Sequence, residues 1–237
     1  MSRRQYFPVF LDLVGKPVAL VGGGEVALRK LLGLLAAGAR VTVISPTLTS
    51  EMQALLAEKK FEHIGRRYRK GDLTGYFLAF VATDDGALNA AVARDGIEIG
   101  VLVNASDDPA NCDFIIPSVI NRGDLTVAIS TGGASPAAAR LIREELEEFL
   151  TEEHALLLEV AAEVRGELRE RDVVVDAEIW NRALQGDVRV LLAAGRREEA
   201  KRKLLQALLG AADGGSDADE AGPLLEAGPE RFVVRGR

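Results

Sequence analysis

The feature that most constrains the fold is a run of three glycines, Gly22–Gly24, between two apolar segments. Residues 17–21 before it predict a buried strand, and residues 27–37 after it predict a helix that stops at Gly38. A strand, a glycine turn and a helix in this order are typical of the first βα turn of a dinucleotide-binding fold. The pattern predicts a dinucleotide site formed by Gly22, Gly23, Gly24, Glu25 and Val26, with a ligand-free glycine turn as the alternative.

Strand and helix signals continue to alternate up to residue 103. Strands are predicted at residues 40–45, 61–68, 76–82 and 99–103, and helices at residues 49–60 and 87–94. Because parallel strands need crossover connections, this order predicts an α/β fold with a Rossmann-like, mostly parallel sheet.

The pattern changes after Asp107. Apolar runs at 114–119 and 125–130, joined by Asn121–Asp124, predict a hairpin, and residues 137–149 predict a long helix. Residues 151–210 are almost all compatible with helix. We therefore expect four sections, namely a Rossmann domain at 1–113, a hairpin-plus-helix section at 114–150, a helical domain at 151–210 and an acidic tail at 211–237.

Charge and composition exclude several classes of protein. The net charge of −7 argues against nucleic-acid binding through bulk charge, and a single cysteine excludes a disulfide scaffold. No apolar run reaches about 18 residues, so no membrane partner is expected. The first residues lack the apolar stretch of a signal peptide, which predicts a cytoplasmic protein. Residues 211–237 carry −3 of the charge, and their composition is typical of a flexible terminus.

The second predicted strand lacks one part of the dinucleotide fingerprint. An acidic residue is expected about 20 residues after the glycine turn, on the ribose hydroxyls, yet this chain has Ser45, Pro46 and Thr47 there. The ribose would have to use the hydroxyls of Ser45 or Thr47, or backbone groups. Because arginine is also missing there, the segment favours NAD over NADP.

Several ordered motifs resemble one known family, precorrin-2 dehydrogenase, which also forms the N-terminal part of multifunctional siroheme synthases. The resemblance covers about residues 5 to 150, and its motifs lie at residues 7–11, 21–30, 38–43, 82–85, 103–107, 114–118 and 128–136. The helical section fits the family more loosely, and the acidic tail matches nothing in it.

The resemblance implies NAD-dependent oxidation of precorrin-2, a tetrapyrrole, to sirohydrochlorin in siroheme or cobalamin biosynthesis. It also implies a homodimer in which the hairpin-plus-helix section at 114–150 of each protomer contacts the other protomer. Two alternatives remain open. Some members of the family also insert ferrous iron into sirohydrochlorin, and a non-catalytic NAD-sensing module whose helical section binds a partner would carry the same glycine turn.

Candidate catalytic residues follow the predicted strand at 99–103. Asp107 and Asp108 precede Pro109 at the carboxyl edge of the sheet, where ligands of open α/β folds bind. A carboxylate there could accept a proton as hydride leaves for the nicotinamide, or it could form a turn before the proline. The resemblance favours Asp107 as the catalytic residue. Asn104 would be a neighbouring substrate contact or a turn residue.

Two further segments carry candidate ligand contacts. The resemblance places Thr83 near the cofactor, while Asp84 or Asp85 is expected to cap the next helix. Ser130–Gly133 precedes a helix with Pro136 in its first turn and suits the carboxylates of a tetrapyrrole. The predicted substrate contacts there are Thr131, Gly132 and Arg140, with Arg143 one turn further along. A capped helix with solvated arginines is the alternative.

No metal site is predicted. The chain has two histidines, His63 and His154, and one cysteine, Cys112, without zinc-type spacing. Cys112 is interpreted as a packing or loop residue, because no histidine neighbours it in the sequence. Trp180 and Arg182 are interpreted as core or dimer residues.

Overall fold

The computed structural model describes residues 5–106 and 112–213, and its chain divides into two compact units. The sheet unit comprises Met1–Ser118 and Ile129–Leu141. The helical unit comprises Val119–Ala128 and Ile142–Arg237. The section predicted at 114–150 is therefore divided between the two units, while the predicted boundaries at 113, 150 and 210 stay predictions.

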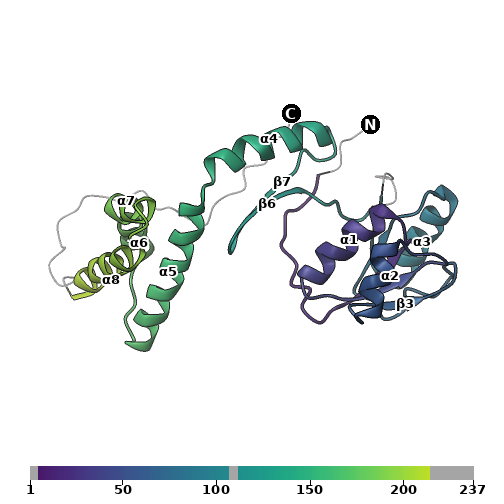
Figure 1. Ribbon diagram of the computed structural model, residues 1–237, viewed down its shortest axis with the longest axis horizontal. Helices are drawn as coiled ribbons and strands as arrows, with labels where there is room; N and C mark the ends of the chain where they lie inside the picture. The colour runs from purple at the N-terminus through teal and green to yellow at the C-terminus, as the bar shows by residue number, and fades with distance from the viewer. Residues whose placement is uncertain (1–4, 107–111, 214–237) are drawn as a thin grey trace. The chain divides into compact units, whose positions relative to one another are not determined.

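The sheet unit contains a five-stranded parallel sheet with the order β3-β2-β1-β4-β5 (Figure 1). Its strands are β1 (Pro17–Val21), β2 (Arg40–Ile44), β3 (Glu62–Ile64), β4 (Leu78–Val81) and β5 (Leu102–Ala105). The chain runs outward from β1 to β3 and then returns to the other side of β1 with β4. The predicted Rossmann-like sheet is thus confirmed, and the strand order reverses between β1 and β4, the switch point where such folds bind ligands.

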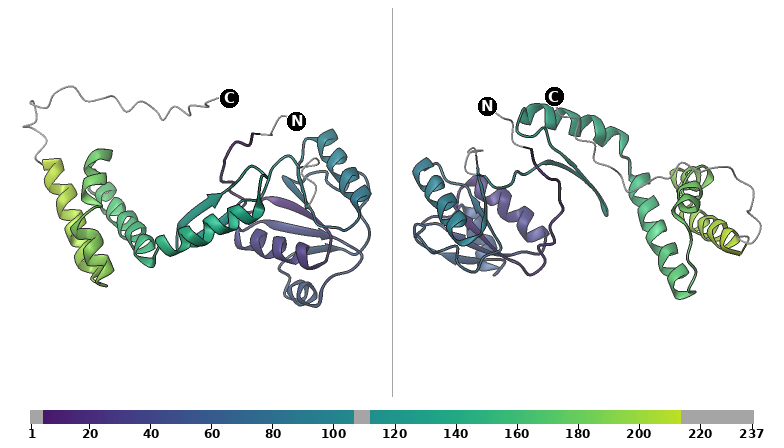
Figure 2. Two further views of the ribbon diagram at one scale, coloured as in Figure 1. Left: turned by 90° about the horizontal axis from the view of Figure 1, so that it is seen from above. Right: turned by 180° about the vertical axis from the view of Figure 1, so that it is seen from behind.

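Helices cover both faces of this sheet (Figure 2). The helices α1 (Glu25–Ala36) and α2 (Ser50–Ala57) pack on the face formed by Leu20 and Phe80. The helix α3 (Gly86–Ile99) packs on the face formed by Ala19, Val21 and Val81. Along β1, β2 and β4 nearly every residue is buried, which explains why these strands read as continuous apolar runs rather than as alternating patterns.

The boundary between α3 and β5 differs from the prediction. The helix runs five residues past the predicted end at residue 94 and takes up Ile99, which was assigned to the strand. Gly100 ends the helix in a left-handed conformation with φ of 77°, as glycine does at many helix C-termini. A Cβ on Gly96 would lie 2.3 Å from the side chain of Val103, so this glycine lets α3 pack closely on β5.

The predicted hairpin is present but begins later. Its strands are β6 (Ser118–Arg122) and β7 (Leu125–Ile129), and Gly123 lies in the turn with φ of 53°. The strand predicted over residues 114–119 is wrong for residues 114–117, because Phe114 packs edge-on against Phe80, with ring centroids 5.3 Å apart. After β7 the chain forms α4 (Pro136–Phe149), close to the predicted helix.

The helical unit contains α5 (Glu152–Glu170), α6 (Ala177–Ala183), α7 (Asp187–Ala193) and α8 (Arg197–Asp213). Their shared core is formed by nine buried residues, namely Val160, Val164, Leu168, Val188, Leu191, Leu192, Ala200, Leu204 and Leu208. Trp180 packs against this core, in agreement with its interpretation as a core residue. The sequence is compatible with helix over residues 151–210, but α7 was not predicted as a separate helix. Among the described residues, no helix combines the length and apolar character needed to cross a membrane.

Candidate functional site

The turn between β1 and α1 is formed by Gly22–Gly24, and its first two glycines are enclosed by backbone. Gly22 has φ of 124°, and a Cβ there would lie 2.2 Å from the carbonyl oxygen of Ala82. A Cβ on Gly23 would lie 2.0 Å from the carbonyl oxygen of Thr47. These two positions therefore require glycine so that the carboxyl ends of β1, β2 and β4 can meet.

Gly24 differs from its two neighbours because it is exposed. No described atom lies within 4 Å of the position that its Cβ would take. It is the N-cap residue of α1, and its carbonyl accepts the first helical hydrogen bond from Leu28 N at 2.9 Å. The N–H groups of the first helical residues, including Glu25 and Val26, have no carbonyl one turn earlier to bind. This end of α1 therefore offers open space, N–H donors and the positive end of the helix dipole to an anion.

The end of β2 supplies a turn rather than a carboxylate. Ser45 is buried, and its hydroxyl donates to the carbonyl oxygen of Thr47 at 2.7 Å. Pro46 and Thr47 are exposed at the tip of this turn. Of the two hydroxyls predicted to hold a ribose, that of Ser45 thus shapes the turn, whereas Thr47 presents its side chain at the surface.

The end of β4 holds a pair of polar side chains. The hydroxyl of Thr83 donates to Asn89 Oδ1 at 2.6 Å, and Asn89 Nδ2 donates to the carbonyl oxygen of Thr83 at 3.1 Å. Asp85 caps α3 by accepting a hydrogen bond from Leu88 N at 3.0 Å, which confirms the predicted cap. Thr83 is thus fixed at the carboxyl edge of the sheet, and its contact with a cofactor stays a prediction.

Asn104, the predicted substrate contact, is 6% exposed and lies on β5. Its Oδ1 accepts a hydrogen bond from Lys30 Nζ at 3.1 Å, and its Nδ2 donates to the carbonyl oxygen of Phe114 at 2.8 Å. Both ends of the amide are therefore used within the protein. Asp107 and Asp108 lie outside the described residues, so the catalytic assignment of Asp107 stays a prediction.

Residues 112–114 are bonded back to β5. Asp113 Oδ2 accepts from Val103 N at 2.8 Å, and Asp113 N donates to the carbonyl oxygen of Val103 at 2.8 Å. The buried Sγ of Cys112 accepts from Ala105 N at 3.2 Å and donates to the Ala105 carbonyl oxygen at 3.0 Å. These contacts agree with the interpretation of Cys112 as a packing or loop residue.

Before α4, the predicted second anion site forms a turn stabilised by its own hydroxyls. Thr131 Oγ1 accepts from Ser135 N at 3.2 Å, and Gly132 N donates to the hydroxyl of Ser130 at 3.1 Å. Gly132 has φ of 60°, and Arg140 is exposed in the second turn of α4. Arg143 pairs with Glu147 at 2.6 Å, so it is held within its own helix.

Two residues at this sheet edge were missed by the sequence analysis, Lys30 and Asn89. Lys30 reads as an ordinary surface lysine of an amphipathic helix, and Asn89 as a polar residue of a short helix. Their contacts depend on how α1 and α3 pack against the strands. The motif at 21–30 that carries the family resemblance includes Lys30, and that inclusion is the one available signal in the sequence.

The resolved pKa shifts in the sheet unit belong to the segment between β3 and β4. The hydrogen bond from Arg66, at 2.6 Å, holds the pKa of Asp72 below its usual value. Burial and a hydrogen bond to Asp95 raise the pKa of Tyr68. These contacts tie the segment to itself and to α3, and we assign them a structural role.

A cavity of about 640 Å³ lies at the opposite edge of the sheet, where β1, β2 and β3 begin. Because open α/β sheets bind ligands at the carboxyl ends of their strands, we do not place the site there. Among the described residues, no group of three histidine, cysteine or acidic side chains is arranged to hold a metal ion.

Comparison with known proteins finds two matching family models. The model described as "Putative NAD(P)-binding" matches residues 9–118, and the model described as "Sirohaem biosynthesis protein central" matches residues 122–148. Among solved structures, the chain is similar to one titled "SirC, precorrin-2 dehydrogenase". That similarity has a TM-score of 0.68 and 29% sequence identity, and covers 86% of this chain and 100% of that chain.

Curated relatives carry the name siroheme synthase. The protein of Photobacterium profundum is 39% identical over 202 residues, which cover 84% of this chain and 43% of the relative. "Siroheme synthase 2" of Aeromonas hydrophila is 44% identical over 164 residues, which cover 69% of this chain and 34% of the relative. The chain therefore spans less than half the length of these curated relatives.

Proposed function

We propose that this chain, which belongs to the family of the N-terminal dehydrogenase part of siroheme synthases, oxidises precorrin-2 to sirohydrochlorin with NAD. The observation that carries the proposal is the glycine turn, where two glycines are enclosed by backbone and the third is open. The substrate assignment is supported by the name of the structural neighbour, whose whole length this chain covers. The siroheme pathway is supported by the names of the curated relatives.

The residues at the β1–α1 turn fit NAD. The N–H groups at Gly24, Glu25 and Val26 would bind the pyrophosphate, and Pro46 and Thr47 would flank the adenosine ribose. The absence of arginine from residues 45–47 favours NAD over NADP. When bound there, NAD supplies the nicotinamide ring that accepts the hydride.

Proton removal is assigned to Asp107. In the sequence the residue follows the end of β5 by two positions, and open α/β sheets bind ligands beyond the carboxyl ends of their strands. A carboxylate there would accept the proton that precorrin-2 loses as its hydride departs. Thr131, Gly132 and Arg140 are proposed to hold the substrate's carboxylates, whereas the buried Asn104 is not proposed to contact them, because both ends of its amide are bonded within the protein.

Asp107→Ala tests this assignment. Anaerobic turnover of precorrin-2 with NAD, followed by NADH absorbance, should slow by about a hundredfold or more, because general base catalysis contributes at least that much. NAD affinity should not change, since Asp107 is outside the glycine turn. Asp108→Ala is the matched control and should keep most of the activity.

If Asp107→Ala oxidises precorrin-2 at nearly the wild-type rate, Asp107 is not the catalytic residue. If the unmodified protein binds NAD but leaves precorrin-2 unchanged, the NAD-sensing module becomes the better assignment.

Iron insertion is the second candidate function, supported by the name siroheme synthase on the curated relatives. Ferrous iron would be a substrate of this reaction, so a permanent metal centre is not required. Adding ferrous iron and sirohydrochlorin to the protein, against a control without protein, tests it. If siroheme forms no faster with the protein than without it, iron insertion is ruled out and the dehydrogenase activity is the one function still proposed.

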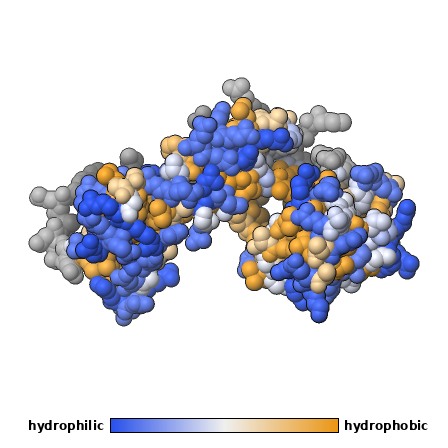
Figure 3. Space-filling view, in the orientation of Figure 1, coloured by the Kyte–Doolittle hydropathy of each residue, from blue (hydrophilic) through white to orange (hydrophobic). Residues whose placement is uncertain are grey.

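We also propose a homodimer. Large apolar side chains are exposed along α4, where Leu141 is 56% and Phe149 is 69% exposed. Figure 3 shows apolar side chains exposed beside charged ones along this stretch. A second copy of this chain would cover them, as the family resemblance implies. The cytoplasmic location stays a prediction of the sequence.

A further inference from the structure

A lysine of α1 reaches the end of β5. Lys30 Nζ donates to Asn104 Oδ1 at 3.1 Å and lies 5.2 Å from the centroid of the Phe80 ring. The side chain is half-buried. Withdrawing an ammonium from water is costly unless hydrogen bonds and favourable charge contacts replace its hydration, so this placement differs from that of a solvated surface lysine.

The parallel register explains why Lys30 meets this residue. Leu20, Phe80 and Asn104 are neighbours on β1, β4 and β5 and face the side covered by α1. The helix therefore begins at the glycine turn, and within two helical turns it contacts the strand that precedes Asp107. One helix thus joins the proposed cofactor turn to the strand that leads to the proposed base.

Lys30 also contributes to the orientation of the Asn104 amide. With Oδ1 toward the ammonium, Nδ2 is directed to the carbonyl oxygen of Phe114, at 2.8 Å. The reversed amide would direct its NH₂ group at the ammonium and its oxygen at that carbonyl, which are two repulsive contacts. The observed orientation is therefore favoured by both contacts, the one with Lys30 and the one with the Phe114 carbonyl, and it secures Phe114 to β5.

We infer that Lys30 is a positioning residue for the proposed dehydrogenation. Through Asn104 it holds residue 114 at β5, beside the bonds that already join Asp113 to Val103. The two ends of the stretch that includes Asp107 are thereby fixed to the same strand. The inference rests on the proposed function, in which Asp107 must lie at a defined place relative to the substrate.

Lys30→Met tests the inference because it keeps the length of the side chain and removes its charge and donors. The turnover number for precorrin-2 should fall by roughly tenfold to a hundredfold, as expected for a misplaced catalytic group. NAD affinity should stay within about twofold, since the glycine turn is unchanged. Lys30→Arg restores a charged donor and should recover much of the turnover number.

Two control variants match the substitution. Arg29→Met removes the neighbouring exposed cation of the same helix. Lys16→Met removes an ammonium 5.6 Å from the ring centroid of Phe77, the same kind of contact at the amino end of β1. Both should keep wild-type turnover. The rate of hydrogen exchange at the Asp113 amide is a readout independent of activity, and it should be faster in Lys30→Met than in either control variant.

The outcomes separate this inference from the proposed function. Wild-type turnover and unchanged exchange in Lys30→Met would overturn the positioning role. A loss of stability without a lower turnover number of the folded enzyme would also overturn it. If the unmodified protein does not oxidise precorrin-2, the proposed function fails, while the exchange measurement still tests the contact.

If Lys30→Met does not fold, Asn104→Asp provides the second variant. It keeps an acceptor for Lys30 and removes the donor to Phe114. It should show the same lower turnover number and faster exchange, and a wild-type result would contradict the inference.

Discussion

The three glycines at the β1–α1 turn have different roles. Gly22 and Gly23 let backbone segments meet, because a methyl group at either position would overlap a carbonyl oxygen. Gly24 has no such neighbour among the described atoms, and its open side faces the space where a ligand's phosphates would lie. Substitutions at Gly22 and Gly24 should therefore separate folding from cofactor binding.

Gly24→Ala should leave thermal stability near that of the wild type and weaken NAD binding by about tenfold or more, since the added methyl occupies the space of the pyrophosphate. Gly22→Ala should lower the free energy of unfolding by about 2 kcal/mol or more through the carbonyl clash and the positive φ. Calorimetric titration with NAD and thermal unfolding provide the two measurements.

Gly33→Ala is the control for Gly24→Ala, because it lies on the same helix with no described atom within 4 Å of its Cβ position. Wild-type NAD affinity in Gly24→Ala would contradict the proposed place of the pyrophosphate.

At the scale of elements, the strands were predictable where burial produced continuous β-branched and apolar runs, as in residues 40–44. The errors arise where tertiary packing overrides that signal. Ile99 joins α3 because Gly100 ends the helix one residue later. Phe114 is apolar because it packs on Phe80, not because it belongs to a strand. The helix α7, at residues 187–193, is too short for its apolar period to stand out.

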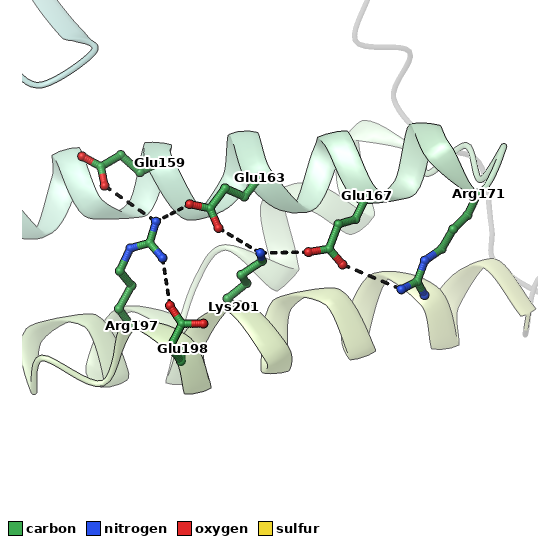
Figure 4. Close-up of polar contacts among 7 residues, drawn as sticks. All are labelled: Glu159, Glu163, Glu167, Arg171, Arg197, Glu198 and Lys201. Atoms are coloured by element: carbon green, nitrogen blue, oxygen red, sulfur yellow. Dashed lines mark hydrogen bonds and ion pairs between the residues drawn. The ribbon is translucent and has the colours of Figure 1, made fainter.

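The helices α5 and α8 are joined by a row of charged side chains (Figure 4). Glu159, Glu163 and Glu167 recur every four residues on α5 and face Arg197 and Lys201 on α8. Lys201 Nζ lies 2.9 Å from Glu163 and 2.8 Å from Glu167. Hydrogen bonds to both carboxylates raise the pKa of Lys201, and those from Lys201 and Arg197 lower the pKa of Glu163.

Lys201→Met should lower the melting temperature of the helical unit slightly, and the difference should shrink in high salt because these charges are near the surface. The lowered pKa of Glu163 stabilises the fold above its unfolded pKa of about 4, and this contribution is lost as the pH falls through the folded value. The raised pKa of Lys201 stabilises the fold at pH values below its unfolded pKa of about 10, and this contribution is lost as the pH rises through the folded value. The difference in melting temperature between Lys201→Met and the unmodified protein should therefore be largest at pH values between about 4 and about 10.

The fluorescence of Trp180 provides the measurement, because it is the one tryptophan of the chain and packs against the core of this unit. Arg202→Met is the control, an exposed neighbour on the same helix. Equal melting temperatures for the two variants at low salt would show that the charged row contributes nothing measurable.

At the scale of the whole molecule, the net charge of −7 would repel the proposed tetrapyrrole substrate, which carries several carboxylates. In the proposed function, substrate binding would then depend on local donors at the turn Ser130–Gly133 and on Arg140. The glycine turn was predictable, because its chemistry lies within one short segment. The pairing of Lys30 with Asn104 was not, because it joins residues 74 positions apart through the register of the sheet.

The proposed homodimer makes a prediction about size. Light scattering at micromolar concentration should give about twice the chain mass of 25.4 kDa. Leu141→Glu combined with Phe149→Glu should shift the protein toward the monomer, because each places a carboxylate in the proposed contact. Ile97→Glu, at an exposed position on α3, is the control. A monomeric wild-type protein would rule out the proposed assembly.

The sheet unit is discontinuous, since Ile129–Leu141 belongs to it although the chain has already entered the helical unit at Val119. During synthesis the ribosome must therefore release residue 141 before the sheet unit has all of its parts. A fragment that ends at residue 118 would lack the segment Ile129–Leu141, even though it contains every strand of the parallel sheet. The two units are consequently linked in biogenesis, and neither can be obtained complete by cutting the chain at one place.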